Sequence, residues 1–338
     1  MLDVNHAAPL VSVITPAYNV ARFIGEAIDS VIAQTQGDFE HLVVDDGSTD
    51  DTAQLVKAYA ARDARVRLLS GGHRGSSAAR NLGIRQARGT YIAFLDGDDR
   101  WHPQFLARSV RALSEAPAHV GAVFCQSRVM NEQGQVYWRR RRRTGDYGLG
   151  QMLITDNPTA NGSVLCIRRE CFQEAGLFDE GLESSVDLEM WLRIAHRARA
   201  GTFRSIRPAL VDIRVRPGAI SRNLSKRMDT NDRLLAIWVP RLRHPDRAKA
   251  YVRPAVMAFR AGDDLRGARL ARSAREAGLR WLLTDGFGLR MLAWNLLSRP
   301  ARPRVRASYR QVKRLVIALV LATEPLTRVR RGSRPSRC

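Results

Sequence analysis

Three aspartates in the segment Asp96-Gly97-Asp98-Asp99 are the residues whose type and spacing best suit chemistry. Carboxylates at positions i and i+2 of a tight turn can converge on one hard cation, and the glycine relaxes the backbone. Mg²⁺ or Mn²⁺ prefers oxygen ligands and keeps open positions for phosphate oxygens. A metal so held would act as a Lewis acid on a departing diphosphate. The alternative is a solvated acidic turn, because DxD tripeptides are common.

A second polar cluster, Asp45-Asp46-Gly47-Ser48-Thr49-Asp50, allows two interpretations. One carboxylate could accept hydrogen bonds from a nucleobase or ribose. Alternatively, Ser and Asp before a helix cap its free N–H groups. Both hold at once if Asp50 or Thr49 caps the helix while Asp45 or Asp46 binds a ligand.

Two further charged residues lie near the starts of predicted helices. Arg80 follows the small residues that open a helix at Gly75, where N–H groups and an arginine could bind phosphate. The alternative is a capped helix with a surface arginine. Asp187 opens a later helix and could deprotonate an acceptor hydroxyl as a general base. It could equally serve only to favour the helix dipole.

Alternating strands and helices must position these side chains. Apolar runs and helical spacing predict, in chain order, a strand at 11–15, a helix at 21–35, a strand at 39–44, a helix at 52–62, a strand at 66–69, a helix at 76–88 and a strand at 91–95. This alternation indicates βαβ units and a mainly parallel sheet. Ligands bind outside the carboxyl ends of such strands, and three of those ends carry the polar clusters.

The later part of the chain is less regular. We predict strands at 120–126 and 162–168 and an amphipathic helix at 187–200. From about residue 228 the pattern becomes helical and rich in arginine, with Gly262-Asp263 as a turn between two helices. The run Arg139 to Arg143 is the only low-complexity tract.

Net charge divides the chain into two parts. Residues 1–220 carry 27 Lys and Arg against 25 Asp and Glu, whereas residues 221–338 carry 28 against 8. The basic excess suggests an appendage that faces an anionic surface, either membrane lipid or nucleic acid. We therefore predict a catalytic domain over 1–225 and an Arg-rich helical region over 226–338.

The cysteines and terminal segments bear on the compartment. Cys125, Cys166, Cys171 and Cys338 form no CxxC pair, which favours reduced thiols in a cytosolic compartment. Residues 1–10 lack the pattern of a secretory signal. The apolar run at 315–322 is shorter than the roughly 20 residues of a bilayer-spanning helix. We expect a cytoplasmic protein, peripheral on the cytoplasmic membrane face if its basic region binds lipid.

Taken together, these clusters resemble the family 2 glycosyltransferases, inverting enzymes with the GT-A nucleotide-sugar-binding fold. The resemblance covers about 180 residues in the family's order. Its segments are Val11 to Asn19, Val43 to Asp50, Ser77 to Ile84, Gly89 to Asp99, and Ala175 to Glu180 followed by Asp187 and Trp191-Leu192-Arg193. It implies an α/β fold of the GT-A type with a mixed, mainly parallel sheet.

The resemblance also implies roles for individual residues. The donor-binding set that it gives is Pro16, Ala17, Tyr18, Asp45, Asp46, Ser77, Arg80, Asp96 and Arg216. Pro16, Ala17 and Tyr18 would line the nucleotide pocket, and Arg80 would lie near the donor phosphates. Asp96 and Asp98, with help from Asp99, would hold ribose and a divalent metal, Mg²⁺ or Mn²⁺.

Two positions depart from the family's pattern. Asp187 takes the place of the catalytic base, but Val186 precedes it where the family usually has Glu. Arg216 stands where the flexible loop over the diphosphate often has His, and an arginine there could contact phosphate but could not bind a metal. The implied mechanism is a single in-line displacement with inversion. Family habit makes the nucleotide-sugar donor a UDP-sugar, with GDP- and dTDP-sugars as the alternatives.

The resemblance leaves the acceptor broad: a saccharide or lipid-linked acceptor in polysaccharide, lipopolysaccharide or other glycoconjugate synthesis. The basic tail could lie on an anionic membrane or pack as a helical bundle on the catalytic domain. Alternatives to the transferase are a non-catalytic nucleotide-sugar-binding relative, prompted by Val186, a nucleotidyltransferase, and a nucleic-acid-binding protein, prompted by the pI of 11.2. Against nucleic acid, the sequence has no helix-turn-helix, RRM or zinc pattern.

Overall fold

The computed structural model describes residues 8–140, 143–154, 159, 161–216, 224–244 and 246–278. The chain divides into two compact units, Met1–Leu234 and Leu235–Cys338. Their boundary lies within helix α8 (Leu224–Trp238), close to the boundary predicted at residue 225.

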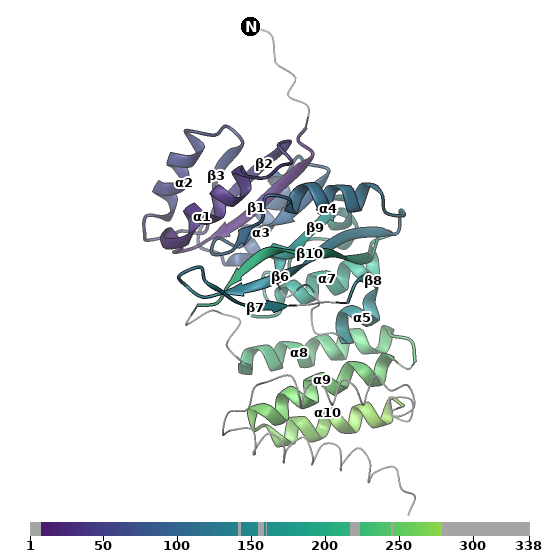
Figure 1. Cartoon of the computed structure of the whole chain (residues 1–338). Helices are drawn as coiled ribbons and strands as arrows, with labels where there is room; N and C mark the ends of the chain where they lie inside the picture. Colours follow the sequence, from purple (N-terminus) through teal and green to yellow (C-terminus); the bar gives the residue numbers. More distant parts are fainter. Residues whose placement is uncertain are drawn as a thin grey trace, which may run out of the picture. The chain divides into compact units, whose positions relative to one another are not determined.

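The first half of the N-terminal unit is a parallel sheet with helical crossovers (Figure 1). Its strands lie in the order β3-β2-β1-β4. They are β1 (Val11–Ala17), β2 (Phe39–Asp45), β3 (Val66–Ser70) and β4 (Tyr91–Phe94). The crossovers are α1 (Ala21–Ile32), α2 (Thr52–Ala60) and α3 (Ser76–Gln86). The predicted alternation is confirmed, with ends that shift by one to three residues.

The second half makes the sheet mixed. It contains β9 (Leu165–Arg168), β6 (Val120–Met130), β10 (Thr202–Arg214) and β5 (Arg100–Trp101), with β7 (Val136–Arg140) beside β6 and β8 (Gly145–Tyr147) beside β10. Strand β9 is antiparallel to both β4 and β6, and β10 is parallel to β6. The carboxyl ends of β1, β2, β4, β6 and β10 therefore meet at one edge.

Helices pack on this sheet through small and aromatic residues. The remaining helices of the unit are α4 (Phe105–Ser114), α5 (Leu149–Ile154), the 3₁₀ turn η1 (Gly162–Val164), α6 (Glu170–Ala175) and α7 (Val186–Arg197). Gly83 lets α3 approach β1, because a Cβ there would lie 2.4 Å from Ile14. On α7, Trp191 is fully buried, with its ring centroid 6.1 Å from that of Phe94 and 5.6 Å from that of Phe178. This contact fixes the start of α7 near the carboxyl end of β4.

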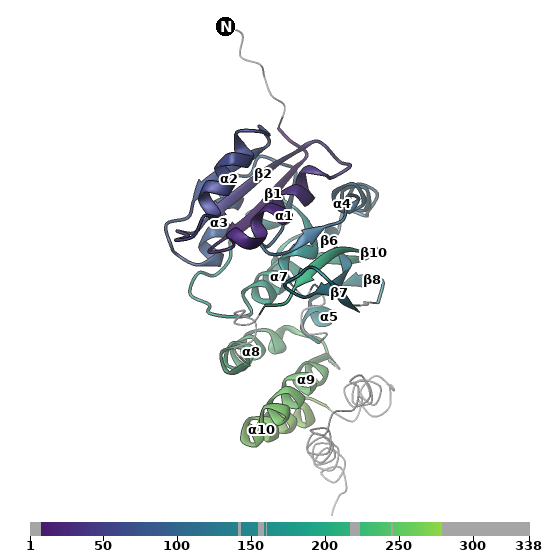
Figure 2. The same ribbon diagram turned by 60° about the vertical axis from the view of Figure 1, so that its left-hand side comes forward.

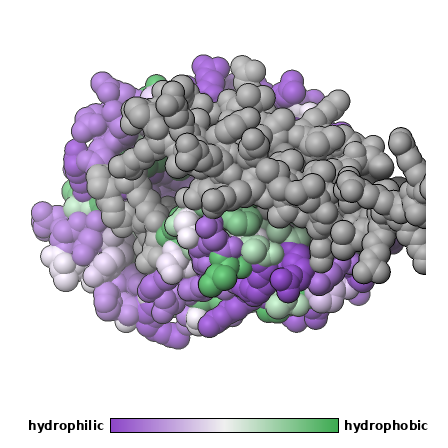
Figure 3. Space-filling model, turned by 90° about the horizontal axis from the view of Figure 1, so that it is seen from below, coloured by the Kyte–Doolittle hydropathy of each residue, from purple (hydrophilic) through white to green (hydrophobic). Residues whose placement is uncertain are grey.

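The second unit contains the helical pair α9 (Asp246–Ala261) and α10 (Asp264–Glu276), preceded by the 3₁₀ turn η3 (Val239–Arg241) (Figure 2). Phe259 packs with Val252, Val256 and Ala271. The predicted turn is present, with Gly262 at a φ of 84°. On the face in Figure 3, most of the described residues are hydrophilic and the hydrophobic ones form small groups.

The predictions about membrane-spanning segments and cysteines can be compared with the described residues only in part. The apolar run at 315–322 lies outside them, as does the rest of the basic region after residue 278. Within the described part of the chain, no helix is long and apolar enough to cross a bilayer. Cys125, Cys166 and Cys171 are free and buried, and burial raises the pKa of the Cys166 thiol to about 12.

Candidate active site

The ends of β1 and β2 bring the predicted nucleotide-binding residues together. Ala17 lies beside Asp45 in the parallel register, and Pro16 lies beside Val44. Tyr18 is exposed just beyond β1, and its ring centroid lies 5.1 Å from that of His73. A flat exposed ring at this edge can stack on a planar group, as the predicted pocket requires.

The two neighbouring aspartates after β2 have different surroundings. The buried Asp46 carboxylate accepts the N–H groups of Arg74 (2.8 Å) and Gly75 (2.7 Å). It thereby shapes the loop that precedes α3. Asp45 is half-buried, and among the described residues its carboxylate accepts one long bond, from the Ser48 N–H at 3.3 Å. Of the pair, Asp45 has the carboxylate better placed for a ligand.

The capping role in the same cluster falls to Asp50. Its carboxylate accepts the N–H of Ala21, the first residue of α1, at 3.0 Å. It also accepts the N–H of Thr52, the first residue of α2, at 3.0 Å. One side chain thus caps the starts of two helices, which satisfies N–H groups that helical bonding leaves free.

Asp99 ties the acidic turn to distant parts of the chain. Its buried carboxylate accepts the Ser163 hydroxyl (2.7 Å), the Asn161 amide (2.8 Å) and the Arg214 N–H (2.8 Å). Burial raises the pKa of Asp99 well above its usual value, and the negative charges of Asp98 and Asp96 add to this. With three donors on its oxygens, Asp99 is engaged in holding the turn.

Asp98 lies against the predicted loop arginine. The Arg216 Nε is 2.6 Å from Asp98 Oδ2, an ion pair. Burial raises the pKa of Asp98, the charge of Asp96 raises it further, and Arg216 opposes both. The structure therefore brings Arg216 to the acidic turn, while residues 217–221 of the loop lie outside the described part of the chain.

Arg80 joins two predicted site residues. Its buried guanidinium lies 2.7 Å from Asp96 Oδ1 and 5.8 Å from the centroid of the Phe178 ring. Asp187 is close enough for its charge to act on Arg80. Ser77, one turn earlier on α3, is also buried. The surface-arginine alternative for Arg80 is therefore wrong, because this side chain is inside the charge cluster.

Asp187 lies in the first turn of α7, with carboxylate oxygen Oδ1 buried and without a hydrogen-bond partner in the described structure. Burial raises the pKa of Asp187, although the Arg80 charge and the Gly162 N–H oppose this, and Asp96 adds to it. A carboxylate with a free oxygen and a raised pKa has the properties of a general base.

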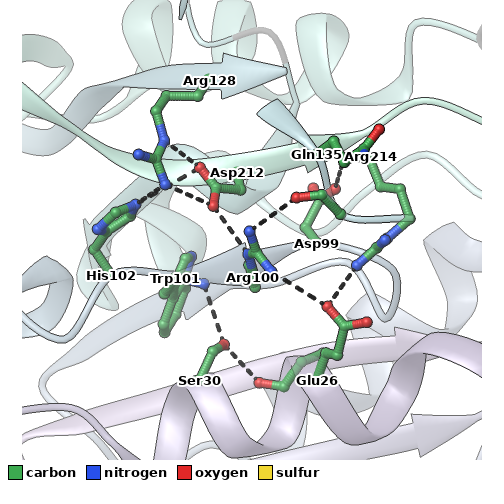
Figure 4. A network of polar contacts seen from close by, with 12 residues as sticks. Glu26, Ser30, Asp99, Arg100, Trp101, His102, Arg128, Gln135, Asp212 and Arg214 are labelled. Carbon is green, nitrogen blue, oxygen red and sulfur yellow. Dashed lines mark hydrogen bonds and ion pairs between the residues drawn. The ribbon is translucent and has the colours of Figure 1, made fainter. Parts of the chain in front are cut away.

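Sequence reasoning missed the central role of Arg214 (Figure 4). Its fully buried side chain pairs with Glu26 at 2.7 Å and donates to the carbonyls of Asp98 (2.9 Å) and Glu132 (2.7 Å). It links α1, the acidic turn and the turn between β6 and β7. Asp212 and Arg214 are two residues apart on β10, and charges at alternate positions of the otherwise apolar stretch 209–214 were the available signal.

The neighbouring network centres on Asp212, also drawn in Figure 4. Its buried carboxylate lies 2.9 Å from Arg100 Nε and 2.6 Å from Arg128 Nε, and His102 is 3.6 Å away. Burial would raise the pKa of Asp212, but these arginines outweigh it and lower it. The network joins β5, β6 and β10 and so braces the edge that carries the site.

The acidic turn offers hard oxygen donors but few of them. In the described residues, no three His, Cys, Asp or Glu side chains gather as a metal-holding group. Asp99 is engaged by three donors, so the carboxylates left to hold a metal are Asp96 and Asp98, which are paired with Arg80 and Arg216 in this structure. Two carboxylates suit Mg²⁺ or Mn²⁺, which commonly take one or two protein carboxylates and complete their shell with substrate phosphates and water.

Comparison with known proteins gives the family. Residues 12–176 match the family model described as glycosyl transferase family 2. The N-terminal unit belongs to glycosyl transferase family 2. The uncharacterized glycosyltransferase EpsJ of Bacillus subtilis (strain 168) is 53% identical over 91 residues, 27% of this chain and 26% of EpsJ.

Two other relatives carry more specific names. The putative teichuronic acid biosynthesis glycosyltransferase TuaG of Bacillus subtilis (strain 168) is 38% identical over 108 residues, 32% of this chain and 43% of TuaG. Chondroitin synthase of Escherichia coli is 28% identical over 203 residues, 59% of this chain and 28% of that protein. The match thus spans less than half the length of EpsJ, TuaG and chondroitin synthase.

Solved structures confirm the GT-A fold. S. aureus TarS 1-349 in complex with UDP-GlcNAc has a TM-score of 0.61 and 19% identity, covering 92% of this chain and 91% of that one. The mannosyltransferase PcManGT from Pyrobaculum calidifontis, in complex with GDP-Man and Mn²⁺, has a TM-score of 0.54 and 22% identity, covering 94% and 89%.

Proposed function

We propose that this protein is an inverting, metal-dependent glycosyltransferase. It would move a sugar from a nucleotide-sugar, with a UDP-sugar the first choice, to an acceptor hydroxyl in polysaccharide, lipopolysaccharide or other glycoconjugate synthesis. The observation that carries the proposal is Asp187, a carboxylate with a buried, unpartnered oxygen beside the Arg80–Asp96 pair at the carboxyl edge of the sheet.

The family relatives support this proposal. TuaG and chondroitin synthase are named for the synthesis of polysaccharides, and the TarS and PcManGT structures hold UDP-GlcNAc and GDP-Man. The exposed Tyr18 ring and the Asp45 carboxylate stand where strands of a parallel sheet present ligand-binding residues. A nucleotide-sugar would place its base there and its phosphates toward Arg80 and Arg216.

In the proposed reaction, Asp187 accepts the proton of the acceptor hydroxyl as the hydroxyl oxygen attacks the anomeric carbon. The bond from that carbon to the diphosphate oxygen breaks, and the nucleoside diphosphate leaves with the bonding electrons. Attack from the opposite side inverts the anomeric configuration. Arg80 and Arg216 add positive charge near the leaving group, which stabilises the charge that develops there.

Asp98 and Asp96 would hold the metal, with Asp99 keeping their turn in place through Ser163, Asn161 and the Arg214 N–H. When bound, Mg²⁺ or Mn²⁺ supplies Lewis-acid stabilisation to the diphosphate. The basic region from residue 226 onward would bring the protein to an anionic membrane face. Sedimentation with anionic vesicles, compared with neutral vesicles, tests that placement.

The test of the central proposal is a donor screen with Mn²⁺ or Mg²⁺ that scores nucleoside diphosphate release. Lipid extract and oligosaccharides serve as acceptors. We expect release with one donor, loss of release in Asp98→Ala and Asp187→Asn, and unchanged release in Asp38→Asn, which alters an exposed aspartate. EDTA should stop the reaction and added Mn²⁺ restore it.

The other outcomes each favour a different protein. Donor binding without turnover would favour the binding-only relative that Val186 prompts. Pyrophosphate release would favour a nucleotidyltransferase. Tight, salt-dependent binding of DNA without donor binding would favour a nucleic-acid-binding protein. A product of retained anomeric configuration would refute the inverting mechanism but not the glycosyl transfer itself.

A further inference from the structure

Strand β7 exposes apolar and basic residues that the proposed chemistry does not use. Val136 is 38% exposed, Tyr137 63% and Trp138 53%, three large apolar residues in succession. Arg139, next in the strand, is exposed as well, and arginines continue through residue 143. Exposed aromatic rings in succession are uncommon on a protein surface and mark interaction sites.

The backbone of this hairpin directs Tyr137 outward. Val129 of β6 pairs with Trp138, whereas the next residue, Met130, pairs with Val136. Tyr137 is therefore the extra residue of a β-bulge. Bulges of this kind re-aim a side chain and are frequent near active sites. The most exposed ring of the strand is thus the one that the bulge turns out of the regular pairing.

The hairpin begins at the proposed active site. Arg214 donates both to the Asp98 carbonyl of the acidic turn and to the Glu132 carbonyl of the β6–β7 turn. Arg100 donates to the Gly134 carbonyl of the same turn at 3.2 Å. From there β7 runs back along β6 for about 15 Å, at roughly 3.3 Å per residue. A molecule lying along β7 would therefore point one end toward the acidic turn.

We propose that Tyr137, Trp138 and Arg139 of β7 form a track for an acceptor saccharide chain that carries carboxylate or phosphate groups. Tyr137 and Trp138 would stack on the apolar faces of sugar rings, and Arg139 would pair with the anionic groups. The track starts beside the proposed active site. An acceptor chain must reach that site, whereas a contact with a bilayer could lie anywhere on the surface. This inference rests on the proposed function and adds the chemical class of its acceptor.

The experiment measures binding of a labelled oligogalacturonate to the full chain without donor. We expect the Tyr137→Ala/Trp138→Ala double variant to bind about tenfold more weakly, and Arg139→Gln about threefold more weakly. Tyr137→Phe/Trp138→Phe keeps the rings and should bind like the parent. Leu265→Ala and Arg199→Gln, whose side chains are exposed elsewhere, serve as matched controls without effect.

Three results would overturn the track. The first is equal binding by the parent and the Tyr137→Ala/Trp138→Ala variant. The second is equal binding of poly-glutamate, which has the charges without sugar rings. The third is a greater loss of anionic vesicle binding than of oligogalacturonate binding in that variant, which would make β7 a membrane contact.

Binding without donor separates this inference from the proposed function. Ring-dependent binding without any nucleoside diphosphate release would keep the track and reject the transferase. Release that depends on Asp187, together with ring-independent binding, would keep the transferase and reject the track.

Discussion

Buried carboxylates at the two ends of the parallel strands have opposite surroundings. Near the amino ends, Glu40 of β2 accepts the Ser12 hydroxyl (2.8 Å) and the Arg88 N–H (2.8 Å), and its carboxylate also pairs with the guanidinium groups of Arg88 and Arg67. Burial alone would raise the pKa of Glu40, but these donors outweigh it and lower the pKa. Its negative charge is fully compensated within the fold.

Around the carboxyl end of β4 the balance is reversed. Burial raises the pKa of Asp98, Asp99 and Asp187, and the charge of Asp96 raises all three further. Like charges held together out of water cost stability, and a fold keeps them where a ligand supplies the missing positive charge. The comparison teaches that uncompensated negative charge separates the carboxylates of the acidic cluster from the structural Glu40.

The largest expected effect that tests this comparison is that of Asp187→Asn. The amide cannot accept the proton, so nucleoside diphosphate release should fall about a thousandfold. The free energy of unfolding should change little, because the variant removes a buried charge with an unpartnered oxygen. Steady-state release and urea unfolding measure the two quantities. A large loss of stability would place Asp187 among the structural carboxylates.

Glu40→Gln should do the reverse. Breaking a buried, paired charge should lower the free energy of unfolding by about 3 kcal/mol, measured by urea titration. Turnover per folded molecule should stay at the parent value. Because the pKa of Glu40 is lowered in the fold, its carboxylate contributes its full stabilisation at pH values above its ordinary pKa of 4.5. That contribution is lost as the pH falls through the pKa of Glu40 in the folded protein. Unchanged stability in this variant would contradict the comparison.

The sequence predicted the parallel half of the sheet because each element there has its own pattern. Strand β1 is rich in apolar residues, β2 contains the apolar run Leu42 to Val44, and α1 repeats its apolar residues at helical spacing. Strand β5 was not predicted, since it has only two residues and exists by pairing with β10. Short edge strands carry no pattern of their own.

The residues of the candidate site also fall into two groups, those that a local motif predicts and those that only the folded chain brings together. Asp96, Asp98 and Arg80 belong to local motifs, so their place could be predicted from the sequence. The partners of Asp99 lie 64 residues away at Ser163 and 115 away at Arg214, distances that no local pattern encodes. Likewise, Asp45 and Asp46 look equivalent in the sequence, and only the packed Arg74–Gly75 loop distinguishes them.

His41 extends the comparison to a buried base among the structural residues. Its Nε2 lies 2.9 Å from the Thr15 hydroxyl, its Nδ1 has no partner in the described structure, and burial lowers its pKa to about 3. Between pH 7.5 and 5.0 the unfolded chain protonates this histidine and the folded chain does not. Stability should therefore fall by about 2 kcal/mol over that range. His41→Gln should flatten this part of the profile in urea unfolding, and identical pH slopes would contradict the assignment.

The smallest expected effect concerns Ser163, whose hydroxyl links the Asp99 carboxylate to the Asp96 backbone. It donates to Asp99 Oδ2 at 2.7 Å and accepts the Asp96 N–H at 3.0 Å. Ser163→Ala leaves Asp99 with the Asn161 and Arg214 donors, so unfolding should become easier by only about 1 kcal/mol. Turnover should fall several-fold, because the Asp96 backbone loses its tether beside Arg80.

Ser205→Ala is the matched control for this variant. That hydroxyl is also buried but has no partner in the described structure, so its removal should leave stability unchanged or slightly higher. Urea unfolding and nucleoside diphosphate release compare the two variants directly. If both behaved alike, the acidic turn would be held by Asn161 and the Arg214 N–H without Ser163. Asp99 would then hold the acidic turn without the link to the Asp96 backbone that the Ser163 hydroxyl provides.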